Sequence, residues 1–547
     1  MLDSTNGAAI AGARVHVRAS PDTQVVLTGA DGRFVLPVTD IAATSFQVSA
    51  ALAYDPAAAI NYETAVVAAS PGSEVQIPLR RLAQQQNLSY QPVTVPGNCG
   101  TCHAEQYQQW LSSNHAHAAR NALVRDLYSG DGTGSPDGPS GQGYVFLDMH
   151  AAPASGLCAT CHAPNERPSD PGGVKFNEVL TDAGREGVTC TSCHQLHDIN
   201  DNVKAIHLLG NAEFRFPAAT GAGGASVTHQ YVWGPLDDIG FPQMRALYAP
   251  VFSSSRMCAS CHEYENPVTG APGQETYTEW LASPAASAGV QCQDCHMPSA
   301  TTPGRIANVG QAPIRPGSQR HDHSFPGVYS GRLGNPVALS FSAAQNAGHL
   351  VVDVAVENLG LGHHYPTGVD VRNAFVLVEA RLDGQPLPLA EGDTLPFWVD
   401  DEVPGQQEGD YAGMAGRGFA KLLEGRIDGQ GPVLSPVPFI DADALTAKTT
   451  IPPGEVDRGT YAFGLPPLSG GTHRVEVRAR VFYRRAWRAI AVAKNWIENE
   501  DGEPWERVVA DRRLDFAVEG PDPNLVLRDG FERMPSVRVI RPADVLD

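Results

Sequence analysis

The ten cysteines of this 547-residue chain all occur in one short pattern. Each belongs to a C-x-x-C pair, and a histidine follows each pair directly. The five motifs read CGTCH, CATCH, CTSCH, CASCH and CQDCH. Their residues are Cys99, Cys102 and His103; Cys158, Cys161 and His162; Cys190, Cys193 and His194; Cys258, Cys261 and His262; and Cys292, Cys295 and His296. No cysteine is left over for a disulfide.

C-x-x-C-H is the attachment signature of c-type haem. The two-residue gap lets one short helical turn present both sulfurs to one porphyrin edge, where they form thioethers. The histidine that follows binds the iron as the proximal ligand. The sequence therefore predicts five covalently bound haem c groups. Because this haem is attached outside the cytoplasmic membrane, we expect a periplasmic or an extracellular, cell-surface protein.

Three other uses of C-x-x-C pairs fit less well. Structural zinc takes four ligands, so five pairs cannot be shared out evenly, and zinc would not require a histidine after each pair. A thioredoxin-like redox motif would occur once, within a βαβ pattern. Disulfides would not all choose the same two-residue gap.

An internal repeat links two of the motif pairs. The stretch CATCHAPNE…EGVTCTSCH aligns with CASCHEYEN…AGVQCQDCH, and QQWLSSNHAHAA resembles TEWLASPAASAG. Repeats of this kind indicate a duplicated supersecondary unit. The unit here is a close pair of haem sites, and we expect short helices around each motif with long loops between them.

Low-spin electron-transfer haems need a second axial ligand on each iron. Eighteen histidines minus the five proximal ones leave thirteen. The candidates are His115, His117, His150, His197, His207, His229, His321, His323, His349, His363 and His364. The remaining two, His16 and His473, lie in terminal β segments and are expected to be ordinary surface residues.

Three further stretches carry a family resemblance. EWLASP…GVQCQDCHMP, RHDHSFPG and VENLGLGHHYPTG resemble the hydroxylamine oxidoreductase-related multihaem cytochromes, over residues 99 to about 380. The resemblance implies distal ligands at His115 in WLSSNHA, His323 in HxFxG and His363 in GHxxPTG, with His364 able to replace His363. Catalytic members carry extra haems and some have a modified motif or a tyrosine crosslink. The five regular motifs here therefore favour electron transfer.

His150 and His229 complete the predicted distal set, because both lie in loops near haem motifs. Five rivals stay open for these positions, and the first of them, in CHQLHDI, is the main one: His197, His117, His207, His321 and His364.

The flanking segments read as β-structure. In residues 1–82, GAAIAGARVHV…TGADGRFVL resembles the carboxypeptidase regulatory-like, transthyretin-like β-sandwich, a family in which a strand precedes DSTNG, so residues before Met1 are expected. Residues 83–98 form a polar linker. Residues 335–547 alternate apolar and polar with period two, which predicts a β-rich domain that supplies a haem ligand from GHHYPTG. The fold class is thus multidomain: a mainly α and loop multihaem cytochrome c domain, 99–334, flanked by two β-sandwich-like domains.

The charge of the chain limits its partners. The formal net charge is −21 and the pI about 5.2, which argues against nucleic-acid binding. No run of about 18 apolar residues predicts a transmembrane helix, and no signal peptide is visible. Redox partners should present a basic docking patch.

The sequence predicts a pentahaem carrier of electrons along mostly bis-histidine haems. Two alternatives stay open: a self-assembling subunit of an extracellular conductive filament, and an oxidoreductase acting on a small nitrogen or sulfur compound at one open haem.

Overall fold

The structure is a computed structural model of the whole chain. It describes residues 1–20, 24–38, 44–84, 86, 98–132, 143–151, 157–166, 174–200, 202, 212–217, 230–240, 244–310, 312–330, 332–334, 337–346, 348–400, 409–499 and 502–520. Most of the predicted linker, His207 and the predicted ligand His229 lie outside these residues.

The N-terminal region is built from short strands. Four of them form an antiparallel sheet in the order β3-β2-β4-β5, and β1 pairs with β6 in parallel. Their apolar residues, among them Val15, Val48 and Ile77, share one buried core. The bounds are β1 (Leu2–Asp3), β2 (Arg14–Val17), β3 (Val26–Leu27), β4 (Phe46–Ala51), β5 (Ala65–Ala69) and β6 (Pro78–Leu79).

Each C-x-x-C-H motif forms or ends one short helix, as the sequence predicted. These helices are α1 (Cys99–Cys102), α5 (Cys158–His162), α7 (Cys190–His194), α8 (Arg256–His262) and α11 (Cys292–His296). The side chain of Asn98 accepts a hydrogen bond from the first residue of α1, and Thr189 with Ser192 forms a capping box on α7. Such caps satisfy backbone N–H groups that a helix start leaves unpaired, which stabilises these very short helices.

The rest of the middle region is short helices, 3₁₀ turns and two-stranded pairs. The helices are α2 (Ala104–Leu111), α3 (Ala122–Ser129), α4 (Phe146–Met149), α6 (Asp182–Arg185), α9 (Thr276–Leu281) and α10 (Pro284–Ser287), with η1 (Ala118–Arg120), η3 (Phe176–Glu178), η5 (Pro250–Ser253) and η6 (Gly317–Gln319). The paired strands are β7 (Leu196–Ile199) with β8 (Ala212–Phe214), β9 (Gln230–Gly234) with β10 (Met244–Tyr248), and β11 (Tyr264–Glu265) with β12 (Pro272–Gln274).

The sequence repeat has a structural counterpart in two tryptophans. Trp110 in α2 donates its indole N–H to the carbonyl of Val188 at 2.8 Å, and Trp280 in α9 donates to Val290 at 2.9 Å. Both valines stand two residues before the first cysteine of a haem motif. The same tryptophan contact therefore fixes the approach to the third and to the fifth motif.

The C-terminal region consists of two sheets that share a core. One has the order β13-β14-β20-β17, and the other the order β19-β18-β15-β21-β22, with β16 added at β15. Their inward residues, such as Val352, Val376, Tyr461 and Val477, form one hydrophobic cluster. The strands are β13 (Ala338–Asn346), β14 (His349–Glu357), β15 (Asn373–Leu382), β16 (Gln385–Pro386), β17 (Leu389–Glu391), β18 (Gly416–Gly425), β19 (Ala442–Lys448), β20 (Val456–Gly464), β21 (Gly471–Arg484) and β22 (Glu506–Gly520); the helical turns are η7 (Phe397–Val399), η8 (Ile427–Gly429), η9 (Phe439–Asp441) and α12 (Arg488–Ala493).

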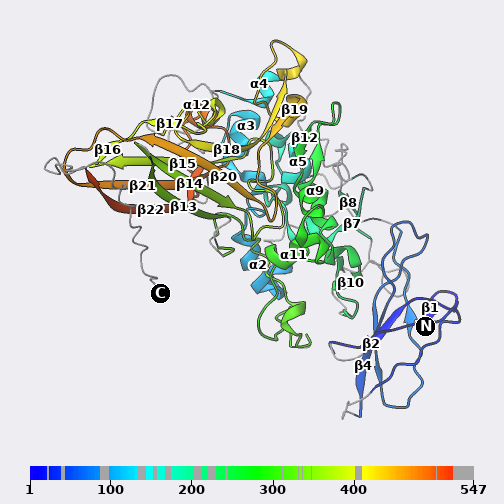
Figure 1. Cartoon of the computed structure of the whole chain (residues 1–547). Helices are drawn as coiled ribbons and strands as arrows, with labels where there is room; N and C mark the ends of the chain where they lie inside the picture. Colours follow the sequence, from blue (N-terminus) through cyan, green and yellow to red (C-terminus); the bar gives the residue numbers. More distant parts are fainter. Residues whose placement is uncertain are drawn as a thin grey trace.

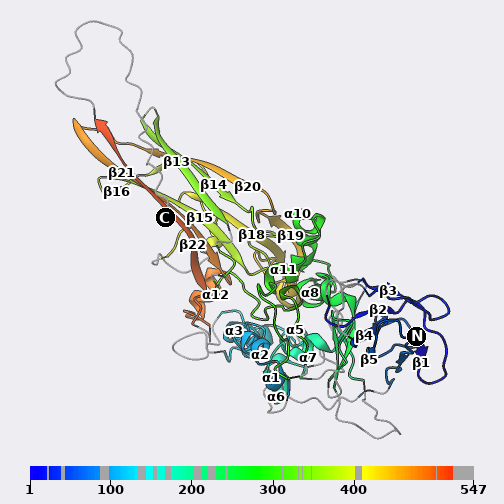
Figure 2. The same cartoon turned by 90° about the horizontal axis from the view of Figure 1, so that it is seen from below.

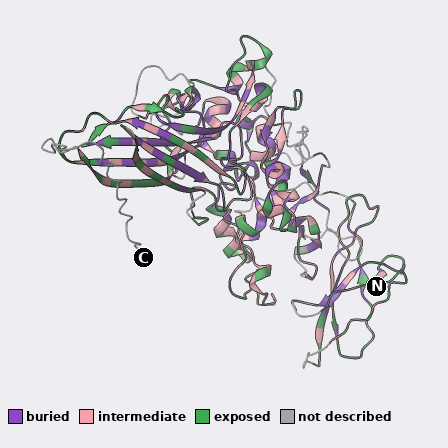
Figure 3. Ribbon diagram, in the orientation of Figure 1, coloured by how far each residue is buried: buried purple, intermediate pink, exposed green. Residues whose placement is uncertain are grey.

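The three regions follow one another in space. The short helices lie between the N-terminal strands and the long C-terminal strands, and β18 and β19 run toward them (Figure 1, Figure 2). In the middle of β21, buried positions alternate with partly exposed ones, as a period-two pattern requires, whereas β15 is buried at nearly every position (Figure 3). Within the described residues, no helix has both the length and the apolar character needed to cross a membrane.

One expectation about the terminal histidines is wrong. His16 is not a surface residue: it is only 8% exposed and lies where the N-terminal sheet meets the middle region. Its Nε2 is 2.8 Å from the carboxylate of Asp237. His473 pairs with Asp383 at 2.7 Å on β21.

Candidate haem-binding site

Four of the five motif histidines share one hydrogen-bonding arrangement. In these four, Nδ1 lies within reach of a backbone carbonyl. His262 differs, because its Nδ1 lies 2.9 Å from the side-chain amide nitrogen of Gln274, which donates to it. The four carbonyl contacts are His103 with Ile306 at 3.1 Å, His162 with Ala118 at 3.1 Å, His194 with Trp233 at 2.6 Å and His296 with Pro326 at 2.8 Å. A carbonyl can only accept, so Nδ1 carries the proton and Nε2 keeps its lone pair for a metal.

Two of the predicted distal histidines stand opposite motif histidines. The ring centroids of His115 and His262 are 6.2 Å apart, and those of His363 and His296 are 6.4 Å apart. A metal–imidazole bond is about 2 Å long and the bonded nitrogen lies about 1 Å from its ring centroid, so two rings on opposite sides of one iron have centroids about 6 Å apart. The spacing of both pairs thus fits one iron between the two rings.

Burial keeps these rings in the form that binds metals. It lowers the pKa of His115 to about 4 and that of His262 to about 3, and the charge of each neighbouring histidine adds to the effect. Both imidazoles are therefore neutral at neutral pH. Nδ1 of His115 is also buried without a hydrogen-bond partner. A metal bond would give this ring a partner that the protein does not provide.

His323 is the third distal prediction that the structure places near a motif. Its Nδ1 lies 2.8 Å from the carbonyl of His321. Burial lowers the pKa of His323 to about 4, and the charge of His194 lowers it further. This coupling puts His323 in the neighbourhood of the third motif, with Nε2 as its free nitrogen.

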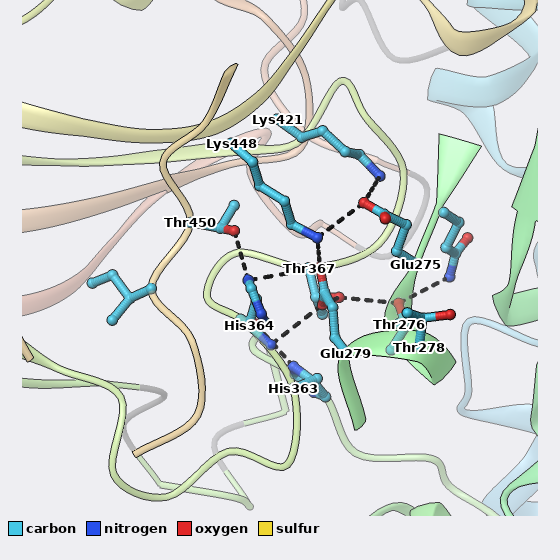
Figure 4. Close-up of polar contacts among 12 residues, drawn as sticks. Glu275, Thr276, Thr278, Glu279, His363, His364, Thr367, Lys421, Lys448 and Thr450 are labelled. Carbon is cyan, nitrogen blue, oxygen red and sulfur yellow. Dashed lines mark hydrogen bonds and ion pairs between the residues drawn. The ribbon is translucent and has the colours of Figure 1, made fainter. Parts of the chain in front are cut away.

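The two adjacent histidines of GHHYPTG point to different surroundings (Figure 4). His363 bonds through Nδ1 to the carbonyl of His364 at 3.0 Å, and its ring faces His296. Nδ1 of His364 instead lies 2.8 Å from the hydroxyl of Thr450. The side chain of Asn358 donates to the carbonyl of His363 at 2.9 Å, which fixes the loop between β14 and β15. This geometry favours His363 over His364 as a ligand.

His150 does not have the geometry of a ligand, which corrects its predicted role. Its Nε2 lies 2.7 Å from Oδ1 of Asp441 and its Nδ1 lies 2.8 Å from the carbonyl of Phe146. Its ring also stacks on that of Phe146 at 4.0 Å. Both ring nitrogens are already used, so His150 has a structural role between α4 and η9.

The rival histidines differ in the contacts that their ring nitrogens make and in their place in the fold. Nδ1 of His197 lies 2.9 Å from the Tyr54 hydroxyl of the N-terminal region. Nδ1 of His321 lies 2.9 Å from the carbonyl of Met297, so its Nε2 remains a possible metal donor. His349 begins β14, and His117 immediately precedes η1.

Contacts between cysteine sulfurs connect the motifs in a way that the sequence could not show. Three pairs of thiols lie close enough to shift each other's pKa: Cys99 with Cys190, Cys161 with Cys261 and Cys258 with Cys292. The thiol of Cys193 is close enough to Cys261 for their charges to interact. Motif one therefore adjoins motif three, motif four adjoins motifs two and five, and motifs three and four are neighbours.

A group of polar residues near the second motif was missed by sequence reasoning. Burial raises the pKa of Asp370 to about 7, and it raises the pKa of Tyr264, on which Asp370 and Cys161 also act. The charge of Arg372 acts on Tyr264 and on His162. Asp370 and Arg372 directly follow GHHYPTG, and this position was the one available signal.

Comparison with known proteins gives one family match. Residues 98–195, which carry the first three motifs, match the model of the family described as cytochrome c554 and c-prime. No curated protein matches the chain. Among solved structures, a penta-heme cytochrome c552 from Thermochromatium tepidum is similar at 20% identity, over 76% of this chain and 97% of that chain, with a TM-score of 0.49. The family match supports a multihaem c-type cytochrome with covalently attached haem; the resemblances to hydroxylamine oxidoreductase-related cytochromes and, for residues 1–82, to carboxypeptidase regulatory-like domains stay predictions.

Proposed function

We propose, from the premise of a multihaem c-type cytochrome, that this protein carries electrons through five covalently bound haem c groups, most of them held between two histidines. The observation that carries the proposal is the spacing of two histidine pairs, His115 with His262 and His296 with His363, at 6.2 and 6.4 Å. When bound, each haem supplies a reversible one-electron iron couple, at a lower potential with two histidines than with histidine and methionine.

The residues of the chain do three things for these groups. The cysteines would fix each group covalently, and the Nδ1–carbonyl contacts of four motif histidines orient Nε2 toward the metal. The distal histidines come from other segments, so a ligand such as His363 ties the C-terminal region to the middle region. Where both axial positions are filled by protein, a small substrate has no open site, which suits electron transfer better than catalysis.

The sulfur contacts suggest an order of transfer. The thioether edges of motifs one, three and four adjoin in sequence, because Cys99 contacts Cys190 and Cys193 lies close to Cys261. Motifs two and five both adjoin motif four, through Cys261 and Cys258. We therefore propose a branched path with the fourth site at its centre.

The proposed location of the protein rests on how thioether haem is assembled, and its proposed partner on the net charge of the chain. Thioether haem is assembled outside the cytoplasm, which supports a periplasmic or extracellular location. The formal charge of −21 supports a redox partner with a basic patch, whose association should weaken as salt is added.

The test is the stoichiometry and spin state of the holoprotein. Mass spectrometry under denaturing conditions should give the chain plus five haems. Electron paramagnetic resonance of the oxidised protein should show low-spin iron for every bis-histidine haem. A mass that requires fewer haems, or a mainly high-spin spectrum, would contradict the proposal.

One observation favours a second candidate function at the second site. The scheme assigns no distal histidine to His162 or to His103, and Arg372, Tyr264 and Asp370 lie near His162. A cationic guanidinium beside proton-donating groups suits a small nitrogen or sulfur oxyanion at an open iron. Titration of the oxidised protein with nitrite or cyanide should then shift about one fifth of the haem spectrum, since one of five sites would be open. Silence toward both ligands would exclude it.

A further inference from the structure

A buried carboxylate holds the loop that carries His363. Glu279, in α9, is only 6% exposed. Its Oε2 accepts from the hydroxyl of Thr367 at 2.6 Å and from the backbone N–H of His364 at 3.3 Å. Its Oε1 lies 3.0 Å from Nζ of Lys448 in β19. One side chain thus contacts the loop at two points and the adjoining sheet at a third (Figure 4).

We infer that Glu279 is a positioning residue for the distal ligand of the fifth haem. The inference deepens the proposed function and rests on it, because it takes His363 as that ligand. The N–H of His364 directly follows His363, so its bond to Glu279 fixes the peptide next to the ligand. The Thr367 bond fixes the other end of the GHHYPTG turn. A histidine at an iron must be held to a fraction of an ångström, and such supporting contacts provide that precision.

The charges around Glu279 are arranged to keep it in place. Burial alone would lower the pKa of Lys448, but the carboxylates of Glu279 and Glu275 raise it, so the ammonium stays charged. Lys448 also lies 2.9 Å from Glu275. A buried carboxylate is stable only when it is paired and hydrogen-bonded, and Glu279 has both kinds of partner.

Helix α9 makes a second contact with Thr367, through the first residue of the helix. The hydroxyl of Thr276, the first residue of α9, lies 3.0 Å from that of Thr367. Because Thr367 donates its proton to Glu279, it accepts here from Thr276. The loop is therefore attached to both ends of one helical turn, and this helix leads through α10 to the fifth motif itself. The helix before the proximal histidine thereby holds the distal one.

The chain offers a matched control. Glu275 lies one turn before Glu279 and binds the same lysine, so Glu275→Gln removes a neighbouring carboxylate charge from the same cluster. Thr367→Val removes the hydroxyl that donates to Glu279, whereas Thr367→Ser retains it.

The experiment compares the spin state of the oxidised holoproteins. His363→Ala comes first and should turn about one fifth of the haem high-spin, since one of five sites loses its ligand. Glu279→Ala should produce a high-spin fraction that approaches this value, and Thr367→Val a smaller one. Glu275→Gln and Thr367→Ser should retain the wild-type spectrum.

Two outcomes would overturn the inference, and they are distinguishable. If His363→Ala creates the high-spin haem while Glu279→Ala and Thr367→Val do not, His363 is the ligand and Glu279 does not position it. If His363→Ala changes nothing, the assignment of the ligand falls and the inference with it. Should Glu279→Ala fail to fold, the contrast between Thr367→Val and Thr367→Ser decides.

Discussion

The two β regions are attached to the middle region by different chemistry. The N-terminal sheet meets it through charged and polar contacts: Arg14 and His16 share the carboxylate of Asp237 at 2.7 and 2.8 Å, and the backbone of Ala19 donates to Asp238 at 2.8 Å. The C-terminal region places a histidine against a motif histidine. Under the proposed ligand assignment, the C-terminal region therefore contributes to a haem site, whereas the N-terminal region lies beside the middle region.

Burial sharpens this difference. At the C-terminal contact, Nζ of Lys494 donates to the backbone carbonyl of the buried Asp126 at 2.9 Å, and the indole N–H of Trp496 donates to its carboxylate at 2.7 Å. Leu123 packs in the same apolar cluster as Ala491 and Trp496. Salt screens a buried contact of this kind less than it screens a partly exposed one. The contact of Arg14 and His16 with Asp237 depends on ionisation and should respond to salt and to pH.

The largest effect should follow the loss of the C-terminal ligand. His363→Ala removes the ring that faces His296, so about one fifth of the haem should become high-spin, as one of five sites is altered. The potential of that haem should rise, because an imidazole that stabilises the oxidised iron is lost. Electron paramagnetic resonance and a redox titration measure both changes.

The neighbouring residue provides the control for this prediction. His364→Ala removes only the contact with Thr450 and should leave every haem low-spin. The reverse result, a high-spin haem in His364→Ala alone, would transfer the ligand role to His364. The comparison between the two β regions would survive, since either residue belongs to the same loop.

The next largest effect concerns a buried ion pair beneath the N-terminal contact. Arg315 lies 2.6 Å from Asp238, and their side chains are only 2% and 3% exposed. Asp238→Asn leaves the guanidinium buried with a neutral partner, which should cost about 3 kcal/mol of unfolding free energy. Chemical denaturation followed by circular dichroism measures this, and the haem spectrum should not change.

A surface pair serves as the control for that cost. Glu178 lies 3.9 Å from Lys175, and their side chains are 59% and 32% exposed, so Glu178→Gln should change the free energy of unfolding by less than about 1 kcal/mol. If both variants lose the same free energy of unfolding, the burial of the Arg315–Asp238 pair does not add to its cost of disruption.

The sequence predicts those parts of the site whose residues lie close together along the chain. A C-x-x-C-H motif places its three residues on one helical turn, so the five helices and their proximal histidines follow from the sequence. Period two likewise predicts the strands of the C-terminal region. The distal partners are different, because His115 lies far along the chain from His262, and family resemblance rather than spacing suggested it.

The errors have the same origin. His150 was chosen because it is near a motif in sequence, but its carboxylate partner, Asp441, lies in the C-terminal region. His16 was expected at the surface because Asp237, which covers it, comes from another domain. Asp370 and Arg372 carry no pattern of their own, and only the fold brings them near His162. In each case the deciding contact joins segments that no local pattern connects.

The corrected role of His150 gives a prediction of medium size. His150→Ala leaves Asp441 buried without one of its hydrogen bonds and also removes the stacking on Phe146, so the free energy of unfolding should fall by about 1–3 kcal/mol. No high-spin haem should form. Thermal denaturation and electron paramagnetic resonance together check both parts, and a high-spin haem in this variant would restore His150 as a ligand.

The smallest effect should be a pH dependence confined to the N-terminal contact. Burial would lower the pKa of His16, but the carboxylate of Asp237 raises it above 6.5. The stabilisation from this ring is thus fully present below pH 6.5 and is lost as the pH rises through the raised value. Burial would raise the pKa of Asp237, but its bonds to His16 and Arg14 lower it to about 2. That contribution is present above pH 3.8 and is lost as the pH falls toward 2.

The contact should therefore be tightest between about pH 4 and pH 6.5 and should loosen above that range. Amide hydrogen exchange in residues 14–19, corrected for its intrinsic pH dependence, should show more opening near pH 8.5 than near pH 5.5, by about threefold or more. In His16→Gln this difference should vanish, while exchange in β18 and β19 should be the same at both pH values in both proteins. If the difference persists in His16→Gln, the pH dependence comes from another group, and the N-terminal region is held by contacts that do not titrate in this range.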